Sequence, residues 1–439
     1  MTSRPVLLPL LLALLMVGCG RSEVDPGPEE DTGRARDGGT RDAGRPDSGV
    51  PDGGNRDGGT ADGGTADGGT PDAGTPDGGS RDGGTPDGGC VEGWRRTSDL
   101  PWSSTSPRAV PLPDGRILVA GGGINAENAA LYDPAIGGFT RIGPMHSPRG
   151  GFKAAALLDG RVLLAGGTGG VPYPHPELYD PATGQFTLTD RLPSVRYNHD
   201  MVRLADGRVL LAGGHDGSVT TATATLWNPS TGLWTLTDPL PAPRENLTLT
   251  LLPDGTVLAA GGFARPRSDA LVPAADAWRY DPATGRWSTT GSLHQARGRH
   301  QAVRLASGEV LMVGGYWNMS DAPDPVTSRA ELYDWRTGAF TEVSPMRFPR
   351  VGHLAELLPS GEVLVAAGAI SNRRDVPNAS EIYSPATNTW RLVPRMLFAR
   401  YSPASAVLPD GSVLAVAGSD LPTAATTTSV EIFTSCPAP

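Results

Sequence analysis

The feature that most constrains this sequence is a unit that recurs seven times between residues 90 and 439. In each copy an apolar segment runs into Asp-Gly or Ser-Gly, and a second apolar segment then ends in Gly-Gly or Ala-Gly. Glycine adopts positive φ angles without steric cost, so each turn pair predicts a tight hairpin. The second segment lacks polar alternation, which predicts a strand buried on both faces. The turn pairs, 45–53 residues apart, are Asp114-Gly115, Asp159-Gly160, Asp206-Gly207, Asp254-Gly255, Ser307-Gly308, Ser360-Gly361 and Asp410-Gly411.

A third and a fourth strand complete the unit. The third expected strand ends in an aromatic residue, as in ALYDP at 130–134, and a short turn such as 182–184 leads to the fourth. The fourth strand carries a second aromatic residue, which is Phe139, Phe186, Trp234, Trp287, Phe340 or Trp390. Four antiparallel strands repeated with this period predict a β-propeller. We therefore expect an all-β fold in which 90–439 forms seven blades.

The same positions carry a family resemblance. The Gly-Gly pairs, the Tyr-Asp-Pro ends of the third strands and the late aromatic residues resemble the kelch repeat over 90–439. This resemblance implies a kelch-type propeller of the galactose oxidase-like superfamily.

The last blade lacks a fourth strand at its own end of the chain, because the sequence stops shortly after Phe433. Trp94 matches the fourth-strand aromatic residues, so we expect the N-terminal strand to complete this blade and close the ring. When the blade is aligned on its neighbours, Cys90 and Cys436 both fall at the turn that joins strands three and four. A disulfide would replace the missing turn in an oxidising compartment. Two free thiols are the alternative.

Residues 1–19 have the pattern of an export signal. Arg4 precedes an apolar run, 6–17, that is too short to cross a bilayer as a helix. Residues 16–19 resemble the lipobox of bacterial lipoproteins, which implies that Cys19 is lipidated. By the same resemblance, Gly20 implies an anchor at the bacterial outer membrane or cell surface. An ordinary signal peptide with an incidental cysteine is the alternative.

Residues 20–89 predict a disordered linker. An aspartate recurs every five residues from Asp37 to Asp87, and without aromatic residues nothing offsets the entropy of ordering. Calcium binding is the alternative, although tight calcium loops place their oxygen ligands at alternate positions. The segment holds 16 acidic residues and 7 arginines, so the −10 charge of the chain belongs mainly to it. An acidic linker and a nearly neutral propeller disfavour nucleic acid as a partner.

An arginine precedes the first strand of six blades, and three of these blades add a histidine three residues later. One interpretation is a ring of imidazoles that could hold a metal near the axis. The other, which we favour, is that these side chains hydrogen-bond neighbouring blades, as the kelch resemblance implies. We therefore assign no metal and no cofactor. The residues are Arg149, Arg196, Arg244, Arg297, Arg350 and Arg400, with His199, His300 and His353.

The loops between the second and third strands vary most, and binding residues concentrate in loops on rigid scaffolds. Aromatic and arginine side chains are common interface anchors, which points to the loops of blades four to six. We expect a non-enzymatic, monomeric module that binds a protein or a glycan at the cell surface and touches the membrane only through its lipid. Merely solvated loops are the alternative. The candidate binding residues are Arg265, Arg267, Tyr316, Trp317, Asn318, Arg373 and Arg374.

The alternative function is a carbohydrate-active kelch enzyme. Galactose oxidase-like propellers bind copper through Tyr and His, with one Tyr crosslinked to Cys. Tyr173, Tyr197, Tyr316 and Tyr401 lie in loops here, but a Cys90–Cys436 disulfide leaves no cysteine for the crosslink. A mutarotase-like enzyme would need only polar residues around the mouth, such as Arg297, Arg299, His300 and Glu245. Nucleotide loops and nucleophile elbows are not found, so we assign no catalytic residue.

Overall fold

The structure is a computed structural model, and it describes residues 90–123, 126–265, 270–319, 325–370, 378–419 and 425–436. The expected signal peptide with Cys19 and the expected linker 20–89 lie outside the described residues. Within those ranges no helix is both long and apolar enough to cross a bilayer.

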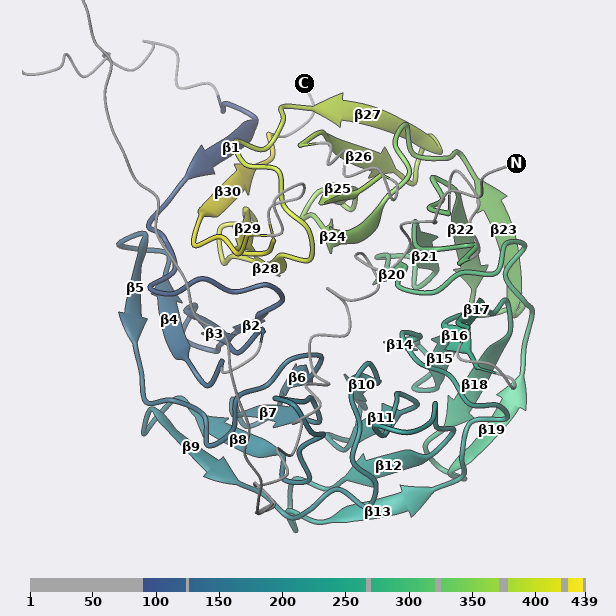
Figure 1. The fold of residues 1–439 in the computed structure, drawn as a ribbon. Coiled ribbons are helices and arrows are strands. Elements are labelled where there is room, and N and C mark those ends of the chain that lie inside the picture. The colour runs from purple at the N-terminus through teal and green to yellow at the C-terminus, as the bar shows by residue number, and fades with distance from the viewer. Residues whose placement is uncertain are drawn as a thin grey trace, which may run out of the picture. The chain divides into compact units, whose positions relative to one another are not determined.

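Seven four-stranded antiparallel sheets surround a central axis (Figure 1), which confirms the predicted seven-bladed β-propeller. Each blade begins with its innermost strand. From the inside outward, blade one is β2 (Arg108–Pro111), β3 (Ile117–Ala120), β4 (Ala129–Asp133) and β5 (Gly138–Arg141); blade two is β6 (Lys153–Ala156), β7 (Val162–Ala165), β8 (Glu177–Asp180) and β9 (Gln185–Leu188); blade three is β10 (Asp200–Arg203), β11 (Val209–Ala212), β12 (Ala224–Trp227) and β13 (Trp234–Thr237).

The remaining blades repeat this order. Blade four is β14 (Thr248–Leu251), β15 (Val257–Ala260), β18 (Ala277–Asp281) and β19 (Arg286–Thr289), with the small hairpin β16 (Phe263–Ala264) and β17 (Val272–Pro273) in its loop; blade five is β20 (Gln301–Arg304), β21 (Val310–Val313), β22 (Ala330–Asp334) and β23 (Ala339–Val343); blade six is β24 (Val351–Leu357), β25 (Val363–Ala369), β26 (Ser380–Ser384) and β27 (Thr389–Val393); blade seven is β28 (Ala404–Val407), β29 (Val413–Val416), β30 (Val430–Thr434) and β1 (Gly93–Arg96).

The core lies between consecutive blades. The second strand of every blade is fully buried along its length, as in β7 and β11, because a neighbouring sheet covers each of its faces. Between blades one and two, for example, Leu118 packs with Val162 and Leu164. This explains why these segments read as continuous apolar runs rather than as alternating patterns.

The N-terminal strand closes the ring as predicted. β1 pairs with β30 in antiparallel register, which sets Trp94 opposite Phe433 with ring centroids 5.3 Å apart. The Trp94 indole N–H also donates to Ser380 Oγ of blade six at 2.9 Å. Cys90 and Cys436 form a disulfide beside this pair. The first and last described strands are therefore joined by backbone, ring and covalent contacts within one sheet.

Polar side chains of the innermost strands join adjacent blades around the axis. Lys153 of blade two forms an ion pair with Asp200 of blade three at 2.9 Å, and the other Asp200 oxygen accepts the backbone N–H of Leu249 in blade four at 2.7 Å. Arg108 and Gln301 bond the carbonyls of Phe152 and His353 in the blade that follows each. These bonds supply partners to strand edges that have no further strand beside them.

Candidate functional site: the mouth of the ring

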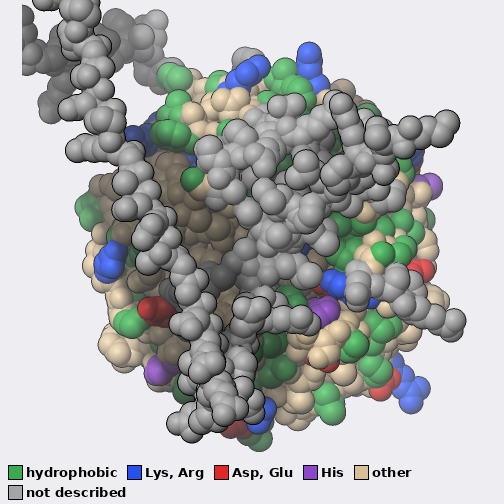
Figure 2. Space-filling model, viewed as in Figure 1, with side chains coloured by type: hydrophobic (Ala, Val, Ile, Leu, Met, Phe, Trp, Pro, Cys, Tyr) green, Lys and Arg blue, Asp and Glu red, His purple; other side chains and the backbone are tan. Residues whose placement is uncertain are grey.

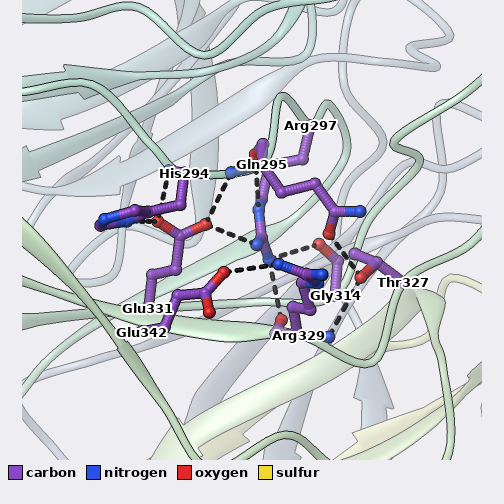
Figure 3. A network of polar contacts seen from close by, with 8 residues as sticks. All are labelled: His294, Gln295, Arg297, Gly314, Thr327, Arg329, Glu331 and Glu342. Atoms are coloured by element: carbon purple, nitrogen blue, oxygen red, sulfur yellow. Dashed lines mark hydrogen bonds and ion pairs between the residues drawn. The ribbon is translucent and has the colours of Figure 1, made fainter.

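The six repeated arginines are buried, and their role is to hold each blade together. Arg297 Nη2 lies 2.7 Å from Glu331 Oε1, and Glu331 also accepts the backbone N–H of His294 at 2.7 Å (Figure 3). Burial lowers the pKa of Arg297, and the Glu331 charge opposes that shift. The equivalent pairs are Arg149–Glu177, Arg350–Glu381 and Arg400–Glu431.

These ion pairs correct one expectation from the sequence. Four of the six arginines bond a glutamate on the third strand of their own blade, as Arg149 does with Glu177 in β8. Arg196 and Arg244 instead bond Thr223 and Asp276, which also belong to their own blades and not to a neighbour. The third strand supplies the partner because it starts at the level where the arginine enters the sheet.

The three repeated histidines do contact the preceding blade. His300 Nε2 lies 3.0 Å from Thr248 Oγ1 in blade four. A Cβ on Gly166 or Gly314 would come within 2.4 or 2.7 Å of the ring of His199 or His353, so the Gly-Gly pairs leave space for these rings. Burial lowers the pKa of His300 to about 3. The rings are therefore neutral packing groups, and no three His, Cys, Asp or Glu side chains of the described ranges are grouped to hold a metal ion.

A belt of backbone surrounds the axis at or just before the start of the innermost strands. It consists of the residue two positions after each repeated arginine, and each has a positive φ between 51° and 63°. We call these six residues the mouth belt. They are Gly151, Asn198, Asn246, Arg299, Gly352 and Ser402.

Hydrogen bonds run along the mouth belt from blade to blade. The N–H of Asn198 donates to Gly151 O at 3.1 Å, that of Asn246 to Asn198 O at 2.8 Å, and that of Arg299 to Asn246 O at 3.1 Å. Isolated bridges tie the flanking residues to the start of the loops between second and third strands, as between Gly298 and Tyr316. The mouth belt therefore lies at the end of the ring from which the variable loops emerge.

One side of the mouth belt holds a buried carboxylate. Glu245 is only 2% exposed, and its oxygens accept Arg265 Nε at 2.9 Å, Thr220 Oγ1 at 3.1 Å and Asn198 Nδ2 at 3.3 Å. Burial lowers the pKa of the nearby His215, and the Glu245 charge opposes that shift. Blades three and four thus bring an acid, an amide and a guanidinium together.

The other side holds two tyrosines and an arginine. Arg299 Nη1 donates to Tyr401 Oη at 3.4 Å, a contact between blades five and seven that passes over blade six. Gly352 makes room for it, because a Cβ there would lie 2.3 Å from the Tyr401 ring. Burial raises the pKa of Tyr316, Tyr401 raises it further, and Arg299 opposes the shift. These three side chains therefore interact across the mouth.

The predicted binding residues have different places. Arg265 lies beside Glu245, Tyr316 is 4% exposed, and Trp317 is 39% exposed next to a half-buried Asn318. Arg267, Arg373 and Arg374 lie outside the described residues. Tyr316 is thus buried, in one apolar cluster with Phe263, Val326 and Val351.

Sequence reasoning partly identified this site. It named Glu245 and Arg299, which lie at the mouth, together with Arg297 and His300, which are buried within and between blades. It missed Asn198 as a partner of Glu245. A signal in the sequence could have identified the mouth belt. Glycine, asparagine or serine stands two residues after five of the repeated arginines, whereas Arg299 stands at that position after Arg297.

Comparisons with known proteins extend only to the fold. No family model matches the chain, and no curated protein matches it. Among solved structures, a fungal alcohol oxidase of the AA5 family, in complex with copper, is similar with a TM-score of 0.66. The identity is 16%, and the match covers 79% of this chain and 76% of the oxidase chain. The chain is thus a seven-bladed β-propeller, and its likeness to this oxidase concerns the fold alone.

The described residues do not fit a copper site of the galactose oxidase kind. Cys90 and Cys436 are joined to each other, so neither thiol of the described ranges can crosslink to a tyrosine. Tyr316 and Tyr401 lie beside the Arg299 guanidinium, whose positive charge would repel a cupric ion. The histidines that follow the repeated arginines pack against the preceding blade. We therefore derive no chemistry through copper.

Proposed function

We propose that the protein is an exported kelch-type propeller that binds a carbohydrate at the mouth belt and does not transform it. The observation that carries this proposal is the convergence of side chains from four blades at one end of the axis. They are Asn198, Glu245, Arg265, Arg299 and Tyr401.

The chemistry of these groups suits a polyhydroxylated ligand. A carboxylate accepts hydrogen bonds, a guanidinium and an amide donate them, and a phenol does both. Ligand sites combine a few such fixed polar groups with apolar and aromatic surface. The exposed indole of Trp317 supplies aromatic surface beside the buried Tyr316.

Long-range charge does not favour a polyanionic partner. On the described surface visible in Figure 2, basic and acidic side chains are interspersed with apolar and uncharged ones. On the face that Figure 2 shows, the described residues form no large field of one sign, so recognition there depends on contacts and not on steering from a distance. A ring of polar groups favours a sugar over the broad apolar face that a stable protein partner would need.

We also propose that Cys19 carries a lipid and that 20–89 is a flexible linker to the outer membrane. The Cys90–Cys436 disulfide supports export, because such bonds persist in oxidising compartments. Mass spectrometry of the N-terminal peptide tests the anchor. We expect the added mass of a diacylglyceryl group on Cys19, and an unmodified Cys19 would contradict the anchor.

A glycan array probed with the purified protein, followed by calorimetry on the glycans that bind, tests the proposed function. Glu245→Gln removes the carboxylate that holds Arg265, so we expect binding to weaken at least tenfold. Arg286→Ala is the matched control, because Arg286 lies exposed on the outermost strand β19. Binding to a purified protein partner without any glycan, or equal binding by both variants, would overturn the proposal.

A copper oxidase is the second candidate, and the likeness to the AA5 alcohol oxidase is the observation that favours it. It predicts one copper per chain and hydrogen peroxide formed from a primary alcohol or a sugar. Metal analysis together with a peroxide assay separates the two candidates. Stoichiometric copper with peroxide formation would replace the binding proposal.

A further inference from the structure

Arg299 is the exception among the described positions of the mouth belt. The equivalent residues are two glycines, two asparagines and a serine, which tolerate or commonly adopt a left-handed backbone. Arg299 has φ +56° although its long side chain has no intrinsic preference for that conformation. Strained backbone of this kind is concentrated at functional sites.

The guanidinium of Arg299 has few contacts for its five donors. Among the described residues, its side chain makes one hydrogen bond, the long 3.4 Å contact to Tyr401 Oη, and no carboxylate pairs with it. Arg265 and Arg297, by comparison, each bind a buried glutamate. Arg299 is also only half-buried, so a ligand can reach it.

Among the described residues, the local charge leaves this cation uncompensated. On the Glu245 side of the mouth, the Arg265 and Glu245 charges cancel within a 2.9 Å ion pair. Below the mouth, the Lys153 and Asp200 charges cancel in the same way. The Tyr401 hydroxyl adds a neutral donor next to Arg299.

From these contacts we infer that the mouth binds an anionic group of its ligand through Arg299 and the hydroxyl of Tyr401. This group is a carboxylate or a sulfate on a sugar. The inference rests on the proposed carbohydrate function and narrows it to acidic glycans. A planar guanidinium matches the two oxygens of a carboxylate, and such charge-assisted bonds are stronger than neutral ones. The strain at Arg299 is then the cost of holding the guanidinium over the axis.

Arg299→Asn tests the inference with a residue that the same position already holds in two other blades. We expect the variant to fold with an unchanged or higher melting temperature. It should bind an acidic glycan at least tenfold more weakly than the unmodified chain, while its affinity for the carboxyl-reduced form of the same glycan stays the same. Arg299→Lys should recover part of the loss, and the affinity of the unmodified chain should fall as salt rises.

The outcomes separate this inference from the proposed function. If glycans bind but Arg299→Asn lowers the affinity for acidic and reduced forms equally, recognition of an anionic group is refuted and carbohydrate binding stands. If only neutral glycans bind the unmodified chain, recognition of an anionic group is again refuted. If no glycan on the array binds, the proposed function and the inference fail together.

Discussion

Removal of the Cys90–Cys436 disulfide should lower stability by an amount that the ring geometry defines. The bond spans 346 residues, for which the loop-entropy relation gives about 6 kcal/mol of stabilisation at 25 °C. With about 2.1 cal/mol/K of unfolding entropy per residue over this span, the melting temperature should fall by up to about 8 °C. The value is an upper limit because the unfolded chain retains residual structure, so the bond removes less entropy from it than the relation assumes.

Scanning calorimetry of the Cys90→Ser, Cys436→Ser double variant measures this effect. A reductant should lower the midpoint of the unmodified chain toward that of the variant and leave the variant unchanged. An unchanged midpoint in the variant would refute the reasoning that the disulfide restrains the ends of the ring.

Three further predictions concern the packing beneath the mouth. Burial lowers the folded-state pKa of both His300 and His353 to about 3. In the unfolded chain the pKa of these histidines is near 6.5, so below that pH the unfolded chain binds more protons than the folded chain does. Stability should therefore fall as pH drops from about 6.5 toward 3, by about 1.4 kcal/mol per pH unit for each histidine, and titration of the unfolding free energy should flatten in His353→Gln. Arg297→Ala leaves Glu331 buried without its cation and should cost about 3–5 kcal/mol in urea unfolding, whereas equal stability would argue against a structural role. Gly352→Ala places a Cβ 2.3 Å from the Tyr401 ring at a φ of +63° and should weaken glycan binding and lower the melting temperature; retained binding would show that Tyr401 is not part of the site.

The sequence predicts the repeating parts of this molecule well. The spacing of the turn pairs places all seven blades, since every buried second strand follows its Asp-Gly or Ser-Gly pair. The placement of Trp94 against Phe433 follows from counting fourth strands, and the cysteine pairing follows from that register. Repetition makes such predictions strong because each copy tests the others.

The site is harder to predict because it forms only when the ring closes. Arg299 and Tyr401 are 102 residues apart and meet across a blade whose glycine leaves the space open. The belt depends on backbone angles at six separate positions, and a left-handed arginine has no sequence signature of its own. The partners of four arginines could have been found, because a glutamate is the first or second residue of the third strand in four blades whose first strand follows an arginine.

The most direct test of the account measures glycan affinity in the presence of a metal chelator, for the unmodified chain and for Glu245→Gln. A carbohydrate-binding mouth predicts affinity that the chelator does not change and that the substitution lowers at least tenfold. Absence of binding to any glycan, together with peroxide formation that the chelator abolishes, would contradict it.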